Sequence, residues 1–574
     1  MTYMQAYEKW LAAPALSPAE KEELRAIADD PREIESRFCS QLSFGTAGLR
    51  GVMGAGLYRM NVHVVRHATQ AFAQVILAEG PAAADRGVCI CFDCRNNSPL
   101  FAREAARVMA ANGVRVRIFE SLRPTPELSF AIRETGAIAG INITASHNPR
   151  EYNGYKVYWS DGAQLPPRHA DQVAAKMQVL DLFDDVRLAD YDEAAAAGLI
   201  TELGAETDEK FLANVMAQVN DRETIAQVSD RFKMVFTPFH GTGFRLIPEA
   251  LRRLGIRHVY CVPEQMVVDG DFPTVVSPNP ENPEGFALAV ELAKQVGADF
   301  ILGSDPDADR IGVMVKNAAG EYVVISGNQT GVLLLDYLIG AKKRAGTMPE
   351  NPVALKTIVT TNMARRVAES GGVTMYDTFT GFKFMAEKKN ALEAAGTGKV
   401  IFSYEESFGY MLGDYVRDKD AVTAAAALTE MAAWYFAQGM TLYDALQALY
   451  RRYGWYGEKT LNLVMPGLDG LAKMRQLMAG LRADPPSEIA GVPVALRRDY
   501  LSGTETDADG TEHAMELSGS DVLSYGLADG TTLLVRPSGT EPKVKVYILC
   551  TGADEADCAA KIARFEAFAD SLAE

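Results

Sequence analysis

Three aspartates occupy alternate positions in the segment SDPDADR, directly after the apolar run ADFILG. Asp305, Asp307 and Asp309 would repel one another at this spacing unless a cation held them, and carboxylate oxygens suit Mg²⁺. An EF-hand also begins with alternating aspartates. It then needs glycine at its sixth position and glutamate at its twelfth, where this chain has Arg310 and Lys316. The segment therefore predicts a magnesium site of another kind, and the alternative is a solvated acidic turn.

One serine follows another apolar run, in the segment INITASHNP. Ser146 lies outside a G-x-S-x-G elbow, which argues against an α/β-hydrolase, and the adjacent His147 cannot be assumed to be a triad base. A serine at a strand end could instead carry a phosphoryl group, whose charge a nearby Mg²⁺ would shield. The alternative is an Asn-Pro turn that simply ends the strand.

The segment RPSGTEPKVK contains the groups that bind phosphate. A guanidinium, two hydroxyls and the N–H groups exposed by a glycine can form a cradle for an anion. It is not a Walker loop, which needs G-x-x-x-x-G-K-[ST]. The alternative is a hairpin turn with a polar tip. The candidate phosphate ligands are Arg536, Ser538, Gly539 and Thr540.

The segment YEESFGY could bind a sugar, because carboxylates accept hydrogen bonds from sugar hydroxyls. Its candidate residues are Glu405 and Ser407, although adjacent acids also occur on ordinary solvated faces. Lys419 follows in RDKD. It could donate a proton if a neighbouring phosphate or carboxylate set its pKa.

The composition limits the possible partners. The chain has 574 residues with 75 acidic and 57 basic side chains, a net charge of −18. This balance argues against nucleic acid or an anionic membrane as the main partner, although a local basic pocket could still bind a small anion. The N-terminus lacks a secretory signal pattern, and the seven cysteines form no disulfide framework, so we expect a cytoplasmic protein. Cys89 and Cys91 alternate as on a strand and are expected in the core rather than at zinc.

Elements that could position these loops recur along the chain as strand, helix and strand, which is typical of βαβ units in mainly parallel sheets. The three predicted sets are 114–121, 126–136 and 137–143; 231–239, 286–297 and 298–303; 354–361, 381–396 and 399–404. A polar loop follows the last strand of each set, where open α/β sheets bind ligands. We therefore expect three related α/β domains whose loops share one cleft.

Beyond about residue 455 the predicted strands are short and alternate with helices, which indicates a smaller α+β domain on an antiparallel sheet. The apolar stretch 421–440 is alanine-rich and contains Glu430, so we expect a buried helix rather than a membrane span. The predicted domains are 1–205 with the serine loop, 206–322 with the aspartate loop, 323–455 with the YEESFGY loop and 456–574 with the RPSGTEPK loop.

Together these motifs resemble the α-D-phosphohexomutase superfamily. FGTAGLRG, TASHNP, DPDADR, TGFK, EESFGY with RDKD, and RPSGTEPK follow one another in the superfamily's order over more than 500 residues. Within it, the chain is similar to the bacterial phosphoglucomutases. The resemblance implies four domains around one central cleft and the isomerisation of α-D-glucose 1-phosphate and glucose 6-phosphate. It further implies Mg²⁺ as cofactor, glucose 1,6-bisphosphate as intermediate and activator, and a monomer or weak homo-oligomer.

The same resemblance assigns roles to individual residues. Ser146 matches the phosphoserine, and a phosphate oxygen on it completes the metal site of the three aspartates. The other positions implied to act in catalysis are His147, Lys419, Arg50 and Arg310. The positions implied to bind substrate are Thr380, Gly381, Glu405, Ser407, Arg536, Ser538, Gly539 and Thr540.

Several other functions stay open. The paired glutamates resemble the glucose-specific branch, whereas mannose-accepting phosphomannomutases usually carry a different loop. NGYKVYW and the chain length also resemble the branch of phosphopentomutases and glucose 1,6-bisphosphate synthases, which departs from EESFG. A Mg²⁺-dependent sugar phosphatase would not need the separate sugar and phosphate loops. An inactive phosphosugar-binding protein would not need the intact serine and aspartates.

Overall fold

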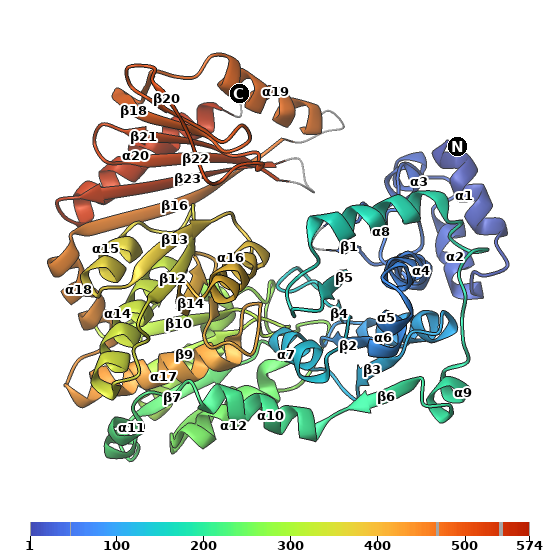
Figure 1. Ribbon diagram of the computed structural model, residues 1–574, viewed down its shortest axis with the longest axis horizontal. Coiled ribbons are helices and arrows are strands. Elements are labelled where there is room, and N and C mark those ends of the chain that lie inside the picture. The colour runs from blue at the N-terminus through green and yellow to red at the C-terminus, as the bar shows by residue number, and fades with distance from the viewer. Residues whose placement is uncertain (1, 46–47, 466–469, 539–542, 573–574) are drawn as a thin grey trace. The chain divides into compact units, whose positions relative to one another are not determined.

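The computed structural model describes residues 2–45, 48–465, 470–538 and 543–572 (Figure 1). Its chain forms two compact units. The first comprises Met1–Ser326 and Ser407–Thr441, and the second comprises Gly327–Glu406 and Leu442–Glu574. Ser407–Thr441, which lies within the segment predicted as one domain from 323 to 455, groups with the first unit.

The first unit begins with three short helices, α1 (Tyr3–Ala12), α2 (Pro18–Ala26) and α3 (Pro31–Phe38). Ser17 caps α2 in a capping box with Glu20, and Pro18 fits the first helical position. The helices bury a small core of their own that contains Trp10 and Phe38. These helices have a structural role and contribute none of the predicted site residues.

The first large sheet has the strand order β1-β5-β4-β2-β3-β6. Its strands are β1 (Leu49–Val52), β2 (Val88–Phe92), β3 (Val116–Phe119), β4 (Ala139–Ile143), β5 (Tyr152–Trp159) and β6 (Ile200–Leu203). β2 pairs in parallel with β3 and β4, and β3 does so with β6, whereas β5 runs antiparallel to β4 and β1.

Helices cover this sheet on both faces. They are α4 (Val62–Ala78), α5 (Pro81–Arg86), α6 (Ser98–Ala111), α7 (Thr125–Thr135), α8 (Pro167–Val179) and α9 (Tyr191–Ala196). Because side chains alternate along a strand, Val88 and Ile90 of β2 join the core shared with α4 and α6. Cys89 and Cys91 face the opposite core, with Leu128 of α7. The expectation that these two thiols pack in the core is confirmed.

The second sheet of the first unit has the order β11-β10-β9-β7-β8. Its strands are β7 (Lys233–Thr237), β8 (His258–Cys261), β9 (Phe300–Ser304), β10 (Ile311–Lys316) and β11 (Tyr322–Ile325). β7 is parallel to β8 and β9, and β10 is antiparallel to β9 and β11. The accompanying helices are α10 (Ala205–Met216), α11 (Arg222–Val228), α12 (Gly243–Leu254), α13 (Ala287–Val296) and α17 (Ala421–Ala437), with a 3₁₀ turn at Pro283–Phe286.

Helix α17 confirms the buried helix expected at 421–440. It packs against α11 and α12, and its Glu430 accepts hydrogen bonds from the N–H groups of Asn220 and Asp221 at 2.8 and 2.6 Å. Those N–H groups belong to the start of α11 and its preceding turn, so the buried carboxylate satisfies main-chain donors. None of the helices described here has both the length and the apolar character needed to span a bilayer.

The serine loop and the aspartate loop both join antiparallel neighbours. β4 leads through Ser146 to β5, and β9 leads through the aspartates to β10. Sequence reasoning placed each loop at the end of a parallel strand, which is confirmed. It did not predict that the chain turns straight back along the same strand. Each loop is therefore held at both ends by a paired strand.

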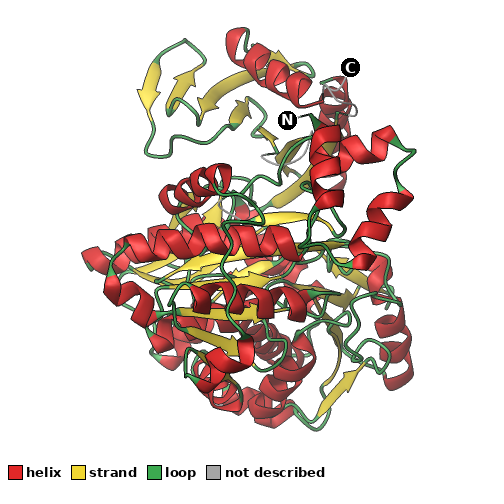
Figure 2. Cartoon of the chain, turned by 90° about the vertical axis from the view of Figure 1, so that its right-hand side faces the viewer, coloured by secondary structure: helices red, strands yellow, loops and turns green. Residues whose placement is uncertain are grey.

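The second unit begins with an α/β part. β12 (Pro352–Thr357) pairs in parallel with β13 (Thr374–Thr378) and β14 (Lys399–Glu405), as expected for this region. Its helices are α14 (Gly327–Ala345), α15 (Met363–Ser370), α16 (Phe382–Ala395) and α18 (Leu442–Tyr453). The short strand β15 (Gly409–Met411) follows in the segment that groups with the first unit. Figure 2 shows the helices and strands of the chain in separate colours.

The rest of the second unit is the antiparallel α+β domain that the sequence predicts. Its main sheet has the order β16-β23-β22-β21-β18-β19-β20. The strands are β16 (Trp455–Val464), β17 (Glu488–Ile489), β18 (Val492–Asp499), β19 (Thr504–Asp507), β20 (Glu512–Ala514), β21 (Leu523–Leu527), β22 (Thr532–Pro537) and β23 (Lys543–Gly552). Leu533 and Val535 face the helices α19 (Gly470–Ala483) and α20 (Glu555–Ser571), whereas Leu534 packs with Phe379 from the α/β part.

Candidate active site

Ser146 adopts an unusual backbone conformation at the tip of its loop. Its φ is 52°, in the left-handed region that residues other than glycine rarely occupy, and its side chain is buried. The N–H group donates to Thr144 Oγ1 at 2.9 Å, which helps to hold the turn. The conformation directs Oγ to Asp305 Oδ2 at 3.0 Å and His147 Nδ1 at 3.2 Å. Strain of this kind persists only where the surroundings impose it, and it clusters at functional sites.

Arg95 holds much of the Ser146 loop in this conformation. Its buried guanidinium donates hydrogen bonds of 2.5 to 3.1 Å to four loop carbonyls, those of Ser146, Asn148, Pro149 and Tyr152. An ion pair with the buried Asp93, at 3.3 Å, balances its charge. Sequence reasoning missed this residue because one arginine after a strand has no distinctive spacing. Its signal was the charged pair Asp93 and Arg95 directly after an apolar run.

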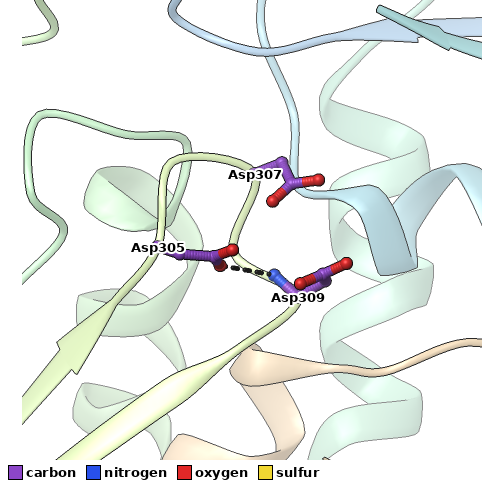
Figure 3. Close-up of side chains that lie close together, drawn as sticks. All are labelled: Asp305, Asp307 and Asp309. Atoms are coloured by element: carbon purple, nitrogen blue, oxygen red, sulfur yellow. Dashed lines mark hydrogen bonds between the residues drawn. The ribbon is translucent and has the colours of Figure 1, made fainter. Parts of the chain in front are cut away.

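The three predicted metal ligands converge in the loop between β9 and β10. One carboxylate oxygen from each of Asp305, Asp307 and Asp309 lies within 4.8 Å of the others, and all three side chains are buried. Figure 3 shows the three carboxyl groups and the hydrogen bond from the Asp309 N–H to Asp305 Oδ1, which is 3.1 Å long. Arg310 N–H donates to the same oxygen at 3.0 Å. Ala308, with φ of 48°, supplies the tight turn between the ligands.

The protein occupies one oxygen of Asp307 and Asp309 and leaves the other available. Lys156 Nζ donates to Asp307 Oδ2 at 2.8 Å, and Lys419 Nζ lies 3.2 Å from Asp309 Oδ2. Within the described chain, the Oδ1 atoms of both residues are buried and have no hydrogen-bond partner. Buried carboxylate oxygens without donors are costly unless a cation binds them. This donor set of hard oxygen atoms fits Mg²⁺.

The charges of the cluster shift the pKa values of its carboxyls in opposite directions. Burial raises the pKa of Asp305 well above its usual range, and the charges of Asp307 and Asp309 raise it further. Burial alone would also raise the pKa of Asp307, but the ammonium of Lys156 lowers it below its usual range. Carboxyls gathered in a buried cluster favour the binding of a cation, which balances their charge.

Lys156 is the second residue that sequence reasoning missed. It lies on β5, in NGYKVYW, and its ammonium is within 2.8 Å of Asp307 and 3.7 Å of Asp309. The signal was a lysine in the middle of an otherwise apolar, buried strand. Buried lysines are almost always paired, so such a position predicts a carboxylate partner.

The segment Ser407–Thr441, which groups with the first unit, also contacts the metal loop. We use this name for the loop between β9 and β10 that carries the three aspartates. Arg310 donates to the Ser407 carbonyl at 3.2 Å, and Ile311 N–H donates to the carbonyl of Phe408 at 3.1 Å. Phe408 is itself in the left-handed region, with φ of 64°. The predicted residues Arg310, Ser407 and Lys419 therefore lie in one contact network with the three aspartates.

Two predicted residues lie beside the serine loop, His147 within it and Arg50 on β1. Arg50, which is exposed on β1, donates from Nη1 to Asn148 Oδ1 at 3.0 Å. His147 contacts the Ser146 hydroxyl, as described above. Burial, followed by the positive charges of Arg310 and Arg50, lowers the pKa of His147 well below its usual range. The lowered pKa favours the neutral form of the imidazole.

The remaining predicted residues lie in the second unit. Gly381, with φ of 114°, precedes α16 beside Thr380, and Glu405 ends β14. Arg536 and Ser538 lie at and just beyond the end of β22, half-buried. Gly539 and Thr540 lie outside the described residues.

Electrostatic effects show that the loops of the second unit approach one another. Burial raises the pKa of Tyr547, the charges of Glu406 and Glu405 raise it further, and Arg536 opposes them. Burial also lowers the pKa of Lys383, and the charge of Arg536 adds to that shift. Arg536 and Lys383 are two cations that repel each other, near the carboxylates Glu405 and Glu406. A pair of cations of this kind is a suitable site for an anion. Lys383 belongs to the TGFK motif, although sequence reasoning assigned it no role.

Comparison with known proteins finds the successive domains of one family along most of the chain. Four segments match the successive domains of the phosphoglucomutase/phosphomannomutase family: α/β/α domain I at residues 41–182, domain II at 209–320, domain III at 326–453 and the C-terminal domain at 482–565.

Two curated relatives are similar over most of their length. A phosphoglucomutase of Staphylococcus epidermidis is 36% identical over 88% of this chain and 90% of its own. A phosphoglucomutase of Staphylococcus aureus is 34% identical over 92% of this chain and 94% of its own.

Among solved structures, parafusin, a phosphoglucomutase of Paramecium, superposes with a TM-score of 0.66 at 18% identity, covering 93% of this chain and 95% of its own. A family protein of Burkholderia thailandensis gives 0.65 at 19%, covering 92% and 97%. These distant structures support the fold alone. The matched domains and the curated relatives together show that the chain belongs to the phosphoglucomutase/phosphomannomutase family.

Proposed function

We propose that this chain is a phosphoglucomutase that interconverts α-D-glucose 1-phosphate and glucose 6-phosphate through a phosphorylated Ser146. The observation that carries the proposal is the Ser146 hydroxyl 3.0 Å from Asp305, beside two further buried carboxylates. The curated relatives named phosphoglucomutase favour glucose as the sugar.

In the first half-reaction a sugar hydroxyl attacks the phosphorus of phospho-Ser146. The bond from phosphorus to Ser146 Oγ breaks and a new bond forms to the sugar oxygen, which loses its proton, while the serine oxygen gains one, so that no net proton is taken up. The product is glucose 1,6-bisphosphate. The second half-reaction reverses these steps with the other phosphate, which returns to Ser146. His147, whose Nδ1 lies 3.2 Å from Oγ, is the proposed donor and acceptor of the serine proton.

Asp305, Asp307 and Asp309, with a phosphate oxygen on Ser146, are the proposed ligands of Mg²⁺. A metal ion bound there would neutralise charge on the transferring phosphoryl group. Lys156 and Lys419 orient two of the carboxylates and balance their charge. The guanidinium of Arg310 adds positive charge beside the same loop.

The proposed sugar and phosphate contacts come from other loops of the chain. Glu405 and Ser407 would accept hydrogen bonds from the sugar hydroxyls. Thr380 and Gly381 lie on a neighbouring loop of the proposed sugar site. Arg536 and Lys383 bind the phosphate that is not being transferred, together with Ser538, Gly539 and Thr540. Both orientations of the bisphosphate must fit, and for this reason the enzyme needs a phosphate site separate from Ser146.

The test is to measure glucose 6-phosphate formation from glucose 1-phosphate, with and without Mg²⁺ and added glucose 1,6-bisphosphate. The same panel should include mannose 1-phosphate and ribose 1-phosphate. We expect the highest kcat/KM with glucose, dependence on Mg²⁺ and activation by the bisphosphate. Faster turnover of ribose or mannose phosphate would reassign the substrate, and release of inorganic phosphate as the main product would indicate a phosphatase.

The predicted domain limits, cytoplasmic location and monomeric or weakly oligomeric state remain predictions. Size-exclusion chromatography with light scattering would measure the oligomeric state. The acidic charge of −18 supports a small-molecule substrate over nucleic acid or an anionic membrane as the main partner.

A further inference from the structure

Thr125 connects the serine-bearing sheet to the metal loop at two points. It is the first residue of α7 and is fully buried. Its N–H donates to the main-chain oxygen of Asp307 at 2.8 Å, and its hydroxyl donates to Asp307 Oδ2, also at 2.8 Å. An N–H group in the first turn of a helix has no partner within that helix. The Thr125 N–H group instead donates to the metal loop.

Asn142 determines the direction of the hydroxyl hydrogen bond. It lies on β4, four residues before Ser146, and its side-chain Nδ2 is 2.7 Å from Thr125 Oγ1. A hydroxyl has one proton, and an ionised carboxylate can only accept. The amide must therefore donate to Thr125, which leaves the Thr125 proton for Asp307. The hydrogen bonds run in one direction, from Asn142 through Thr125 to Asp307.

We propose that this relay from Asn142 through Thr125 is a positioning device that orients the Asp307 carboxylate toward the metal ion. The inference rests on the proposed magnesium site. With Oδ2 held by Thr125 and Lys156, the carboxylate cannot rotate without breaking two hydrogen bonds, and Oδ1 remains directed to the cluster. Partners behind metal ligands commonly fix ligand orientation in this way.

The relay also links the two loops that must act together. Asn142 belongs to the strand that leads to Ser146, and Asp307 belongs to the loop between β9 and β10. A displacement of β4 would therefore move both Ser146 and the Asp307 carboxylate. The relay thus fixes the position of Ser146, the proposed phosphoryl carrier, relative to Asp307, a proposed metal ligand.

The test compares Thr125→Val, which removes the hydroxyl but keeps the branched shape, with Thr125→Ser, which keeps the hydroxyl. Thr135→Val is the matched control, because Thr135 lies on the same helix and its hydroxyl donates to the main-chain oxygen of Ala131. Each full-length protein is freed of phosphate on Ser146 and titrated with MgCl₂ by calorimetry. Mn²⁺ electron paramagnetic resonance then reports the symmetry of the bound ion.

We expect Thr125→Val to weaken Mg²⁺ binding by about 10- to 100-fold, the effect typical of residues behind metal ligands. Thr125→Ser and Thr135→Val should bind as the wild type does. In turnover assays the Mg²⁺ concentration for half-activation should rise in Thr125→Val by a similar factor. At saturating Mg²⁺ its kcat should largely recover, which would not occur if the variant were only misfolded.

Equal Mg²⁺ affinity and an unchanged Mn²⁺ spectrum in Thr125→Val would overturn the relay while leaving the proposed function intact. Weaker binding in Thr125→Ser or Thr135→Val to the same extent would overturn it too, because the effect would not depend on this hydroxyl. A wild-type protein that neither binds Mg²⁺ nor needs it for turnover would overturn the metal site itself, and the relay with it.

Discussion

The two units of the chain hold their charged groups in opposite ways. In the first, the carboxylates that face Ser146 are buried and paired with Lys156 and Lys419. In the second, Arg536 and Lys383 repel each other, and Arg536 is half-buried. Groups around a bond that breaks need fixed positions before the substrate arrives. Groups that bind a phosphate in two orientations can instead rely on the ligand to neutralise them.

This comparison predicts that changes in the first unit stop the reaction, whereas changes in the second weaken substrate handling. The largest effect should come from Ser146→Ala, which we expect to lower kcat by on the order of 10⁴-fold or more, the scale typical of a lost covalent nucleophile. Thermal unfolding should be near that of the wild type, and Ser370→Ala on α15 is the control. Near-normal turnover of Ser146→Ala would remove the serine from the mechanism.

Asp307→Ala should have the next largest effect. It removes a proposed ligand outright, so Mg²⁺ binding should weaken on the order of 10³-fold, beyond the 10- to 100-fold expected for residues behind the ligands. Chelation should likewise stop the wild-type enzyme, and Mg²⁺ should restore it. Calorimetric titration and rates at several Mg²⁺ concentrations measure both effects. Full activity of metal-free enzyme would contradict the first half of the comparison.

Arg536→Ala tests the second unit. Loss of a charged contact to phosphate should cost about 2–4 kcal/mol, which is roughly a 30- to 900-fold fall in kcat/KM. The variant should depend more strongly on added glucose 1,6-bisphosphate, because the intermediate escapes more often, while Ser146 still carries phosphate by mass. Arg497→Ala, on β18 of the same sheet, is the control. If Arg536→Ala keeps the wild-type kcat/KM, the loop is only a turn.

The smallest effect concerns stability. Burial raises the pKa of Glu458 on β16 to about 7, while a hydrogen bond with Thr361 opposes the shift. A carboxyl whose pKa rises on folding favours the folded state below pH 4.5, and that contribution disappears as the pH rises through 7. Glu458→Gln should therefore gain about 1–3 kcal/mol relative to the wild type between pH 5 and 8. Parallel Tm profiles of the two proteins over this range would show that Glu458 is solvated.

Much of this arrangement could be predicted from sequence because periodicity and motif position are local signals. The Asp305 to Asp309 spacing identified the carboxylate cluster between β9 and β10, and the apolar strand before Ser146 identified the serine loop. The short strands predicted in the C-terminal part of the chain indicated its antiparallel sheet. These features depend on residues that are close together in the chain.

What sequence reasoning missed depends on contacts between distant segments. Thr125, Asn142 and Lys156 lie on three different elements. Only the pairing of β4 with β5 and the approach of α7 to the metal loop bring them together near Asp307. Likewise, four carbonyls separated along a loop give no spacing pattern that would point to Arg95. The grouping of 407–441 with the first unit could not be predicted, because it depends on α17 packing against α11 and α12.

The most direct test of the account is to follow the phosphate on Ser146. Enzyme carrying a labelled phosphate is mixed with glucose 1-phosphate in a single turnover, and protein mass and labelled products are measured together. The proposed phosphoserine mechanism predicts that the protein first loses one phosphate while labelled glucose 1,6-bisphosphate forms. Glucose 6-phosphate and rephosphorylated Ser146 should then appear. Label released as inorganic phosphate, or turnover without any change at Ser146, would contradict it.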